Sequence, residues 1–365
     1  MPYQKLTRFI FCLMIVCFFS INTQAGMDKR EMYVESKMYG HSETSSIKQI
    51  VFDDFEGSDY AGGKRSFTHN NWESGVRFKQ FKLATIARYD YVLSYTQDVA
   101  ELIYADKNSK QIETNREYDL YLDVLHARSY GFKFGYSFSL LPSLTMGVDV
   151  SALKLTSFMD GEITGNVLVG DDSYDGDIFL DYVYSQDKLL DRIADTPSGY
   201  GYAVDVRWDF QVNDRLSIDA EVLDLLSQIK IDRAPFTTAG ATSNRVNLDA
   251  NGRIDVKPVL TGGESYRKHT LKLPQRLSLK GRYLLSNAYE LGARFDRYDD
   301  SIYTSLLFTI PFDNKQQVQT AFDFRTEALT LGWLDQYWRC AITSDQFDIS
   351  KARTFGLSFS LAHHF

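Results

Sequence analysis

Large apolar or aromatic residues alternate with small, polar or charged residues along much of this chain. From residue 200 to residue 212, every second position is apolar or aromatic, and the positions between carry small, polar or charged side chains. After a tight connection at 213–215, the alternation resumes over 216–222 and breaks at Leu223. A period of two residues is typical of β-strands with one apolar face. This stretch therefore predicts two antiparallel strands joined by a short turn, the second ending near Leu223.

The same alternation continues toward the C-terminus and predicts a series of strands there. Their expected ranges are 276–285, 289–297, 302–312, 316–325, 328–334, 337–343 and 353–365. The stretch 200–212 is longer than the roughly five or six residues common in soluble sheets, and aromatic residues gather at the ends of the apolar stripes. A soluble β-sandwich would also alternate. These two features favour an all-β fold, a transmembrane antiparallel up-and-down β-barrel of about 14 strands, within a range of about 12 to 18.

The chain ends with the sequence FGLSFSLAHHF, which is patterned as a strand up to its last residue, Phe365. A closed barrel needs such a strand, because its last strand must pair with its first. If strands alternate in direction backwards from Phe365, the short connections at 213–215 and 286–288 lie at the same end as Phe365. The long segments 155–199 and 226–275 then lie at the opposite end, the second as a loop or as an even number of extra strands.

Four segments fall outside this strand pattern. Residues 1–25 combine a basic start, an apolar run and a small final residue, which predicts a cleavable signal peptide, with an uncleaved anchor as the alternative. Residues 26–47 are polar and poorly patterned, so they are expected to form a tail or a plug, with the barrel at 48–365. The segment 93–116 is a candidate for folding into the lumen. Residues 186–195 are expected to form a short amphipathic helix on the barrel rim.

Composition narrows the range of partners. Removal of a signal peptide would also remove Cys12 and Cys17 and leave Cys340, so no intrachain disulfide and no cysteine-based metal site are expected. The chain carries 40 basic and 48 acidic residues, a net charge of −8, which argues against nucleic acid as a partner. Aromatic residues make up 14% of the chain, although no long apolar run follows the N-terminal one. This combination fits a barrel whose membrane-facing apolar residues alternate with inward residues and therefore form no continuous apolar run.

The final stretch resembles the C-terminal recognition strand of Gram-negative outer-membrane β-barrels. The residues that carry this likeness are Phe359, Leu361, His363 and Phe365. The resemblance implies that these residues are an assembly signal read by the barrel-assembly machinery. It also implies a location in the outer membrane of a Gram-negative bacterium, in contact with outer-membrane lipid and lipopolysaccharide. The stretches at 199–225 and 273–296 are similar to strand pairs of the long-chain fatty-acid channels and the TraF-like barrels, although the Asn-Pro-Ala type of segment that those channels carry is absent after residue 25.

Charged residues on the inward side of two predicted hairpins define a candidate lumen. An Arg or Lys facing lipid near the membrane midplane costs about 2–4 kcal/mol, so these residues are expected to point inward. In the hairpin at 200–222 one basic residue faces four acidic ones, and in the hairpin at 276–297 basic residues are in excess. The predicted lumen-lining residues are Asp205, Arg207, Asp209, Asp219, Glu221, Lys280, Arg282, Glu290, Arg294 and Asp296.

Metal-binding and catalytic motifs are few. The stretch GDDSYDGD offers four oxygen-bearing side chains for a divalent cation, those of Asp171, Ser173, Asp175 and Asp177. Because Tyr182 stands where a calcium loop needs a bidentate glutamate, an acidic solvated loop is expected instead. Histidine is scarce, and none is spaced from a serine as a base from its nucleophile. No catalytic residue, metal or cofactor is therefore predicted.

The predicted function is that of a solute channel or transporter with a narrow or plugged charged lumen and no enzyme activity. The expected solute is a small molecule of unknown identity. The alternative is a non-catalytic barrel that serves as an accessory of a machine for secretion, conjugation or surface-polymer assembly. The mostly polar inward residues fit a polar lumen better than the apolar pocket of a fatty-acid channel.

Overall fold

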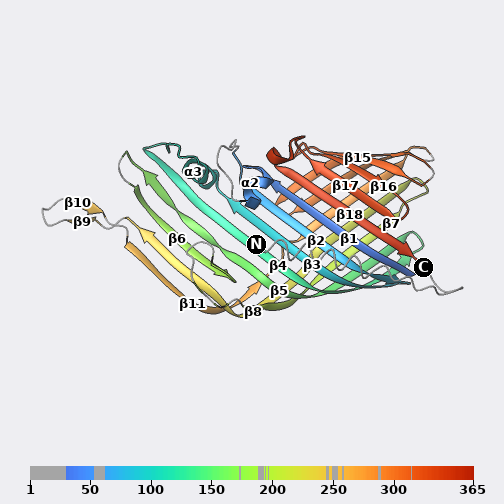
Figure 1. Ribbon diagram of the computed structural model, residues 1–365, viewed down its shortest axis with the longest axis horizontal. Coiled ribbons are helices and arrows are strands. Elements are labelled where there is room, and N and C mark those ends of the chain that lie inside the picture. Colours follow the sequence, from blue (N-terminus) through green and yellow to red (C-terminus); the bar gives the residue numbers. More distant parts are fainter. Residues whose placement is uncertain are drawn as a thin grey trace.

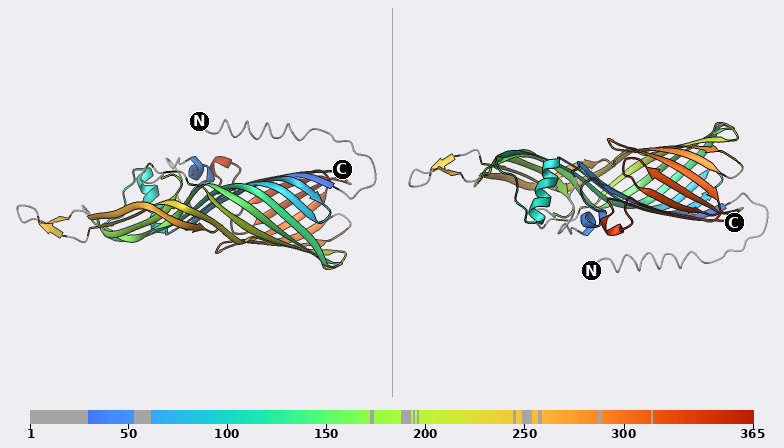
Figure 2. Two further views of the ribbon diagram at one scale, coloured as in Figure 1. Left: turned by 90° about the horizontal axis from the view of Figure 1, so that it is seen from below. Right: turned by 90° about the horizontal axis from the view of Figure 1, so that it is seen from above.

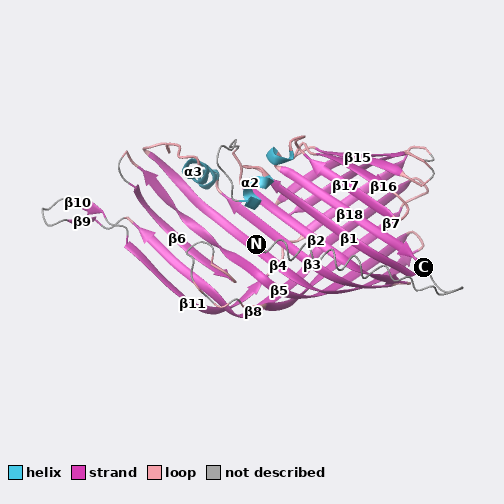
Figure 3. Cartoon of the chain, in the orientation of Figure 1, coloured by secondary structure: helices cyan, strands magenta, loops and turns pink. Residues whose placement is uncertain are grey.

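The computed structural model describes residues 30–52, 62–171, 174–187, 193, 195, 197–243, 246–248, 254–256, 259–286, 289–313 and 315–365. The predicted signal peptide and most of the predicted helix at 186–195 lie outside these residues. The main sheet contains β1 (Arg30–Ser42), β2 (Arg65–Phe78), β3 (Phe81–Tyr95), β4 (Arg116–Leu141), β5 (Leu144–Val169), β6 (Tyr174–Tyr184), β7 (Gly199–Gln211), β8 (Leu216–Thr242), β11 (Val259–Leu271), β12 (Arg276–Leu284), β13 (Glu290–Tyr298), β14 (Ser301–Pro311), β15 (Gln317–Asp323), β16 (Leu329–Leu334), β17 (Trp338–Ser344) and β18 (Thr354–His364). A small separate sheet contains β9 (Val246–Leu248) and β10 (Ile254–Val256), and the helices are α2 (Ile47–Phe52), α3 (Gln97–Lys107) and the 3-10 helix η1 (Ile349–Lys351) (Figure 3).

Fourteen strands of the main sheet form a closed antiparallel ring (Figure 1). Their order around the ring is β1-β2-β3-β4-β5-β7-β8-β12-β13-β14-β15-β16-β17-β18, and β18 pairs with β1 to close it. The closure extends to the last residue, because Arg30 and Phe365 exchange two backbone hydrogen bonds of 2.9 and 3.3 Å. The predicted barrel of about 14 strands is confirmed, and the seven C-terminal strands begin and end within two residues of their expected ranges.

The expectation that residues 26–47 form a tail or plug is wrong for most of that segment. Residues 30–42 are strand β1, which pairs with β18 on one side and β2 on the other, so the barrel begins there and not at residue 48. The sequence of β1 shows no clear alternation of apolar and polar residues, because polar residues occupy both faces of the strand. Glu35 and Lys37 point inward, while Ser36 interrupts the outward row that contains Met32 and Met38. Residues 26–29 lie outside the described part of the chain.

On one side the sheet continues beyond the ring as a curved extension, which we call the wing (Figures 1 and 2). It consists of residues 116–127 of β4, 158–169 of β5 and 229–242 of β8, together with β6 and β11. β6 fills the space between β5 and β8, and β11 pairs with β8 alone. The wing lies at the end of the ring opposite Phe365.

The predicted end of a strand near Leu223 is wrong, because β8 continues to Thr242. Between β7 and β8 the register shifts, so that Val204 pairs with Leu226 and Val206 with Val222. Two extra residues on β8 therefore form a β-bulge, and the bulge breaks the alternation without ending the strand. The connection at 213–215 and the hairpin turn between β12 and β13 both lie at the end of Phe365, as expected, and the long segments lie at the other end.

The two faces of the ring differ as the alternation predicts. On β4, Phe132 and Phe134 point outward and are 67% and 51% exposed, whereas Lys133 between them points inward and is 5% exposed. An outward apolar band with aromatic residues is typical of a membrane-facing barrel surface. None of the described helices is long and apolar enough to cross a membrane.

Part of the outer face of the wing is covered by helix α3. Helix α3 packs on the outward residues Tyr118 and Leu120 of β4, which are buried together with Val169 of β5. The hypothesis that the segment 93–116 folds into the lumen is therefore wrong, since alternation places Tyr118 and Leu120 on the same side of β4 as Phe132. The outward apolar residues of this part of the sheet therefore have a cover of protein, whereas Phe132 and Phe134 on the ring do not.

Candidate functional site

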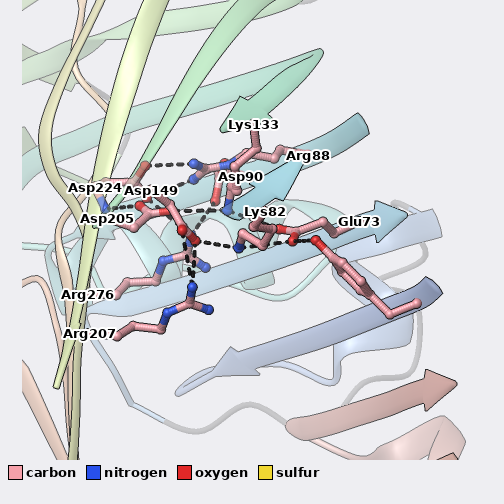
Figure 4. A network of polar contacts seen from close by, with 11 residues as sticks. Glu73, Lys82, Arg88, Asp90, Lys133, Asp149, Asp205, Arg207, Asp224 and Arg276 are labelled. Atoms are coloured by element: carbon pink, nitrogen blue, oxygen red, sulfur yellow. Dashed lines mark hydrogen bonds and ion pairs between the residues drawn. The ribbon is translucent and has the colours of Figure 1, made fainter. Parts of the chain in front are cut away.

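Ten charged residues on the inner face of the ring form one connected network, which we call the ion-pair layer (Figure 4). They come from seven different strands, from β2 around to β12. Five are acidic and five are basic, so the layer has no net formal charge. Its members are Glu73, Lys82, Arg88, Asp90, Lys133, Asp149, Asp205, Arg207, Asp224 and Arg276.

Arg88 on β3 joins two distant parts of the ring. Its guanidinium donates to both carboxylate oxygens of Asp224 on β8, at 2.6 and 2.8 Å, and to Asp90 at 3.0 and 3.2 Å. β3 and β8 are four places apart in the ring, so this pair crosses the interior instead of linking neighbouring strands. Arg276 on β12 completes the group, 3.2 Å from Asp224 and 3.9 Å from Asp90. The planar fork of arginine suits this bidentate geometry.

Asp224 reaches the interior because it lies in the bulge of β8. Its φ of 56° is uncommon for residues other than glycine, and Asp and Asn tolerate it better than most. The backbone N–H of Asp224 donates to the carboxylate of Asp205 at 2.9 Å, which fixes the bulge to the neighbouring strand β7. The break in alternation at Leu223 therefore marks the point where a buried carboxylate enters the network.

A glycine on β4 allows one ion pair to pass between strands that are not adjacent. Lys82 on β3 pairs with Asp149 on β5, and Gly135 of β4 is in register with both. A Cβ atom at Gly135 would lie 2.2 Å from a carboxylate oxygen of Asp149, so a larger residue cannot occupy this position without displacing that side chain. Lys133, two residues before the glycine, lies 3.0 Å from Asp205. Since these side chains are buried, loss of any one would leave an uncompensated charge.

Above the ion-pair layer, aromatic side chains from opposite walls of the ring meet in what we call the mouth stack. Its members are Phe67 on β2, Tyr298 on β13 and Tyr303 on β14. The rings of Phe67 and Tyr298 are stacked, with their centroids 4.1 Å apart. β2 and β13 are seven places apart in the ring of 14, which is the largest separation possible. Arg65, at the start of β2, spans the same gap and donates to Asp299 at 2.6 Å.

Beyond the mouth stack, a cavity of about 640 Å³ opens at the end of the ring opposite Phe365. Its size lies in the range of pockets that hold small molecules. Charged residues of both signs line it, namely Glu43, Lys64, Arg65, Asp98, Asp119, Asp300 and Arg325. Burial raises the pKa of Glu43, but the Lys64 N–H and the Arg325 guanidinium, 2.9 Å away, outweigh it and hold the pKa below its usual value.

The predicted lumen-lining residues occupy inward positions, and the structure brings some of them together. Asp205 and Arg207 belong to the ion-pair layer. Two further pairs form beyond it, Asp219 with Arg282 at 2.8 Å and Asp296 with Arg294 at 2.6 Å. Within the described residues the remaining four have no ion-pair partner, namely Asp209, Glu221, Lys280 and Glu290. Whether these residues line a solute path stays a prediction.

Sequence reasoning missed most of the ion-pair layer. The members absent from the predicted lumen-lining set are Glu73, Lys82, Arg88, Asp90, Lys133, Asp149, Asp224 and Arg276. The stretch FKLATIARYDY on β3 does alternate, with Lys82, Arg88 and Asp90 on one face and aromatic residues on the other. That alternation identifies these residues as inward charges, but it does not identify their partners.

The other predicted motifs have different outcomes. Phe359, Leu361 and Phe365 are exposed on the outward side of the last strand, and the role of these residues and of His363 in assembly stays a prediction. The expected acidic loop is replaced by strand β6, in which Asp175 and Asp177 lie; Ser173 falls outside the described residues, and Asp171 accepts a hydrogen bond from Asn115. In the described ranges, no group of three or more His, Cys, Asp or Glu side chains is arranged to hold a metal ion.

No protein-family model matches the chain, and no curated protein matches it. Similar solved structures include a deletion mutant of the monoaromatic hydrocarbon channel TodX, at 8% identity, 93% coverage of this chain and 91% of that chain, and a TM-score of 0.47. The toluene transporters TodX of P. putida and TbuX of Ralstonia pickettii each share 10% identity over 93% of this chain, cover 91% and 90% of their own chains, and have TM-scores of 0.42 and 0.41. The barrel is established by the chain's own strand pairing.

Proposed function

We propose that this protein is an outer-membrane β-barrel that works as a gated channel for a small polar solute, and that the structure is its closed state. The observation that carries the proposal is contact between opposite walls of the ring. Phe67 stacks on Tyr298 seven strands away, and Arg88 bridges four strands to Asp224. Contacts of this kind block passage along the interior, and they consist of side chains that can separate without unfolding a strand.

The remaining inner wall supports a polar path. Several inward positions on β15 to β18 carry small residues, including Ala321, Gly332, Ala341 and Ser358. On the adjoining arc of the ring, β8, β12 and β13 carry the charged pairs of Arg282 and Arg294. A wall with charged groups on one side and small residues on the other suits a hydrated solute better than a lipid.

The proposal is tested by conductance of the purified protein in planar bilayers. The wild type is expected to show small or intermittent conductance, because both sets of contacts close the path. A variant with Phe67→Ala, Tyr298→Ala and Arg88→Ser should conduct at least severalfold more. The matched control is Arg339→Ser, which removes an exposed inward arginine of β17 whose side chain has no ion-pair or hydrogen-bond partner among the described residues.

Two outcomes would contradict the proposal. Large, steady, salt-proportional conductance from the wild type would mean that the contacts do not close the barrel. Absence of conductance from every folded variant would favour the alternative of an accessory barrel for a secretion, conjugation or surface-polymer machine. The wing is the feature that fits that alternative, since it offers a large surface at one end, and co-purified partner proteins would then be expected.

A further inference from the structure

The inner face of the wing carries its residues in rows that cross β4, β5 and β6. Strand register places one row at Asp123, Glu162 and Asp181, the next at Tyr121, Thr164 and Phe179, and the third at Asp119, Asn166 and Asp177. Residues two apart on a strand are about 6.7 Å apart along it. The two acidic rows are therefore about 13 Å apart, with an aromatic row between them.

The acidic rows have more negative charge than the wing neutralises. Arg267 pairs with Asp181 at 2.7 Å, and His269 lies 2.7 Å from Asp160. By contrast, within the described part of the chain the carboxylates of Asp119, Asp123 and Glu162 have no hydrogen-bond or ion-pair partner. Asp123 and Glu162, which lie in register, therefore carry like charges without a counter-charge, and in the third row Asp119 is the unpaired acid, since Asp177 interacts with another residue.

Two further observations bear on what would fit this surface. Burial, followed by the charges of Asp160 and Glu162, raises the pKa of Asp123. The ionised carboxylate is therefore less stable here than in water, and a bound cation would stabilise it. In the row between the acids, Tyr121 is 38% exposed and Phe179 is 49% exposed, so both rings are accessible to a ligand. Exposed rings attract both alkyl groups and cations.

We propose that the inner face of the wing binds a linear polyamine, with its terminal ammonium groups at the two acidic rows and its methylene chain over Tyr121 and Phe179. The spacing of about 13 Å suits a chain with three or four amines and exceeds the length of a short diamine. Asp119 and Tyr121 also line the 640 Å³ cavity above the mouth stack, so the site leads to the barrel entrance. As a statement about the solute, the inference rests on the proposed channel function.

Isothermal titration with the full-length protein in detergent micelles tests the binding. Three probes are compared, namely spermidine, 1,4-diaminobutane and hexaamminecobalt(III), which has the same charge as spermidine but no alkyl chain. Spermidine is expected to bind at least tenfold more tightly than either of the others. Equal binding of spermidine and hexaamminecobalt(III) would show that the wing attracts cations by charge alone, and this would overturn the proposal. Tighter binding of the diamine would also overturn it.

Variants locate the site. Asp119→Asn with Asp123→Asn should weaken spermidine binding at least tenfold, whereas Asp214→Asn, at the opposite end of the barrel, should leave it unchanged. Tyr121→Phe should bind as the wild type does and Tyr121→Ser should not, which separates a role in binding from the loss of two charges. Equal weakening in the Asp214 control would contradict the proposal. Binding and conductance can fail separately: tight spermidine binding by a barrel that never conducts would refute the channel and leave the wing site standing.

Discussion

Replacement of Arg88 by leucine should destabilise the barrel by about 3–5 kcal/mol, because it removes the main cation from two buried carboxylates. Asp90 and Asp224 are 2% and 1% exposed, so neither can recover its lost interactions from water. Arg88 donates four hydrogen bonds to them, whereas Arg276 remains at 3.2 Å from Asp224 and 3.9 Å from Asp90. Because Arg276 still offsets part of the charge, the lower end of that range is expected.

A double-mutant cycle with Asp224→Asn isolates the pair that crosses the interior. Asparagine keeps the side-chain shape and tolerates the positive φ of the bulge, so it removes the charge with little backbone strain. In the double variant Arg276 and Asp90 remain as one basic and one acidic group. The two changes should therefore cost less together than their sum, with a coupling of about 2 kcal/mol.

Urea unfolding in micelles, followed by the fluorescence of the four tryptophans, measures these differences. Arg339→Leu is the matched control and should change stability by no more than about 0.5 kcal/mol, since Arg339 is exposed. A cost of less than about 1 kcal/mol for Arg88→Leu would show that the bridge to Asp224 is not maintained. Strictly additive costs would show that the two residues do not interact.

Three further predictions concern other parts of the chain. Gly135→Ala should destabilise the barrel by about 1–3 kcal/mol, because the new methyl group collides with Asp149, whereas Gly281→Ala, which meets nothing within 4 Å, should be neutral in the same urea assay. Deletion of Phe365 should reduce the amount of heat-modifiable barrel in the outer membrane while export continues, and normal amounts would refute its role in assembly. Because the pKa of Asp123 is raised, the ionised carboxylate destabilises the wing at pH values above that pKa. Asp123→Asn should therefore slow amide hydrogen exchange in the wing at neutral pH. The difference from the wild type should vanish once acid protonates the wild-type carboxyl.

Alternation predicted the fold well where one face of a strand is uniformly apolar. The strands from β12 to β18 were expected almost at their observed bounds for this reason. The pattern failed at β1, because polar residues lie on both of its faces, and at Asp224, because the bulge turns an even-numbered residue inward on a strand whose other even-numbered residues point outward. A single sequence shows a break in alternation in the same way whether the strand ends there or bulges.

The candidate site was less predictable because its contacts depend on how the ring closes. Alternation places Asp205 and Arg207 inside, and the structure agrees, but their partners Lys133 and Asp149 lie on other strands. Arg88 and Asp224 are 136 positions apart in the chain, and the sequence around either residue does not indicate that the other is its partner. Such pairs follow from the number of strands and the shape of the closed ring.

The balance of charge in the ion-pair layer also bears on how the barrel could open. If one side chain rotated away from its partner, the buried partner would keep an uncompensated charge, which costs several kcal/mol. Rotation of single side chains is therefore an unfavourable way to open the barrel. A movement of the wall that carries Asp224 would exchange partners within the layer instead, because Asp90 already lies 3.0 Å from Arg88 and 3.9 Å from Arg276, the two groups that Asp224 would leave. The bulge on β8 is the natural place for that movement, since Asp224 and Leu225 have no register partner on β7 or β12, although the Asp224 N–H donates to the Asp205 carboxylate. The wing is a continuation of β8 above this bulge, so a ligand that changes the position of the wing acts on the strand that carries the central carboxylate of the layer.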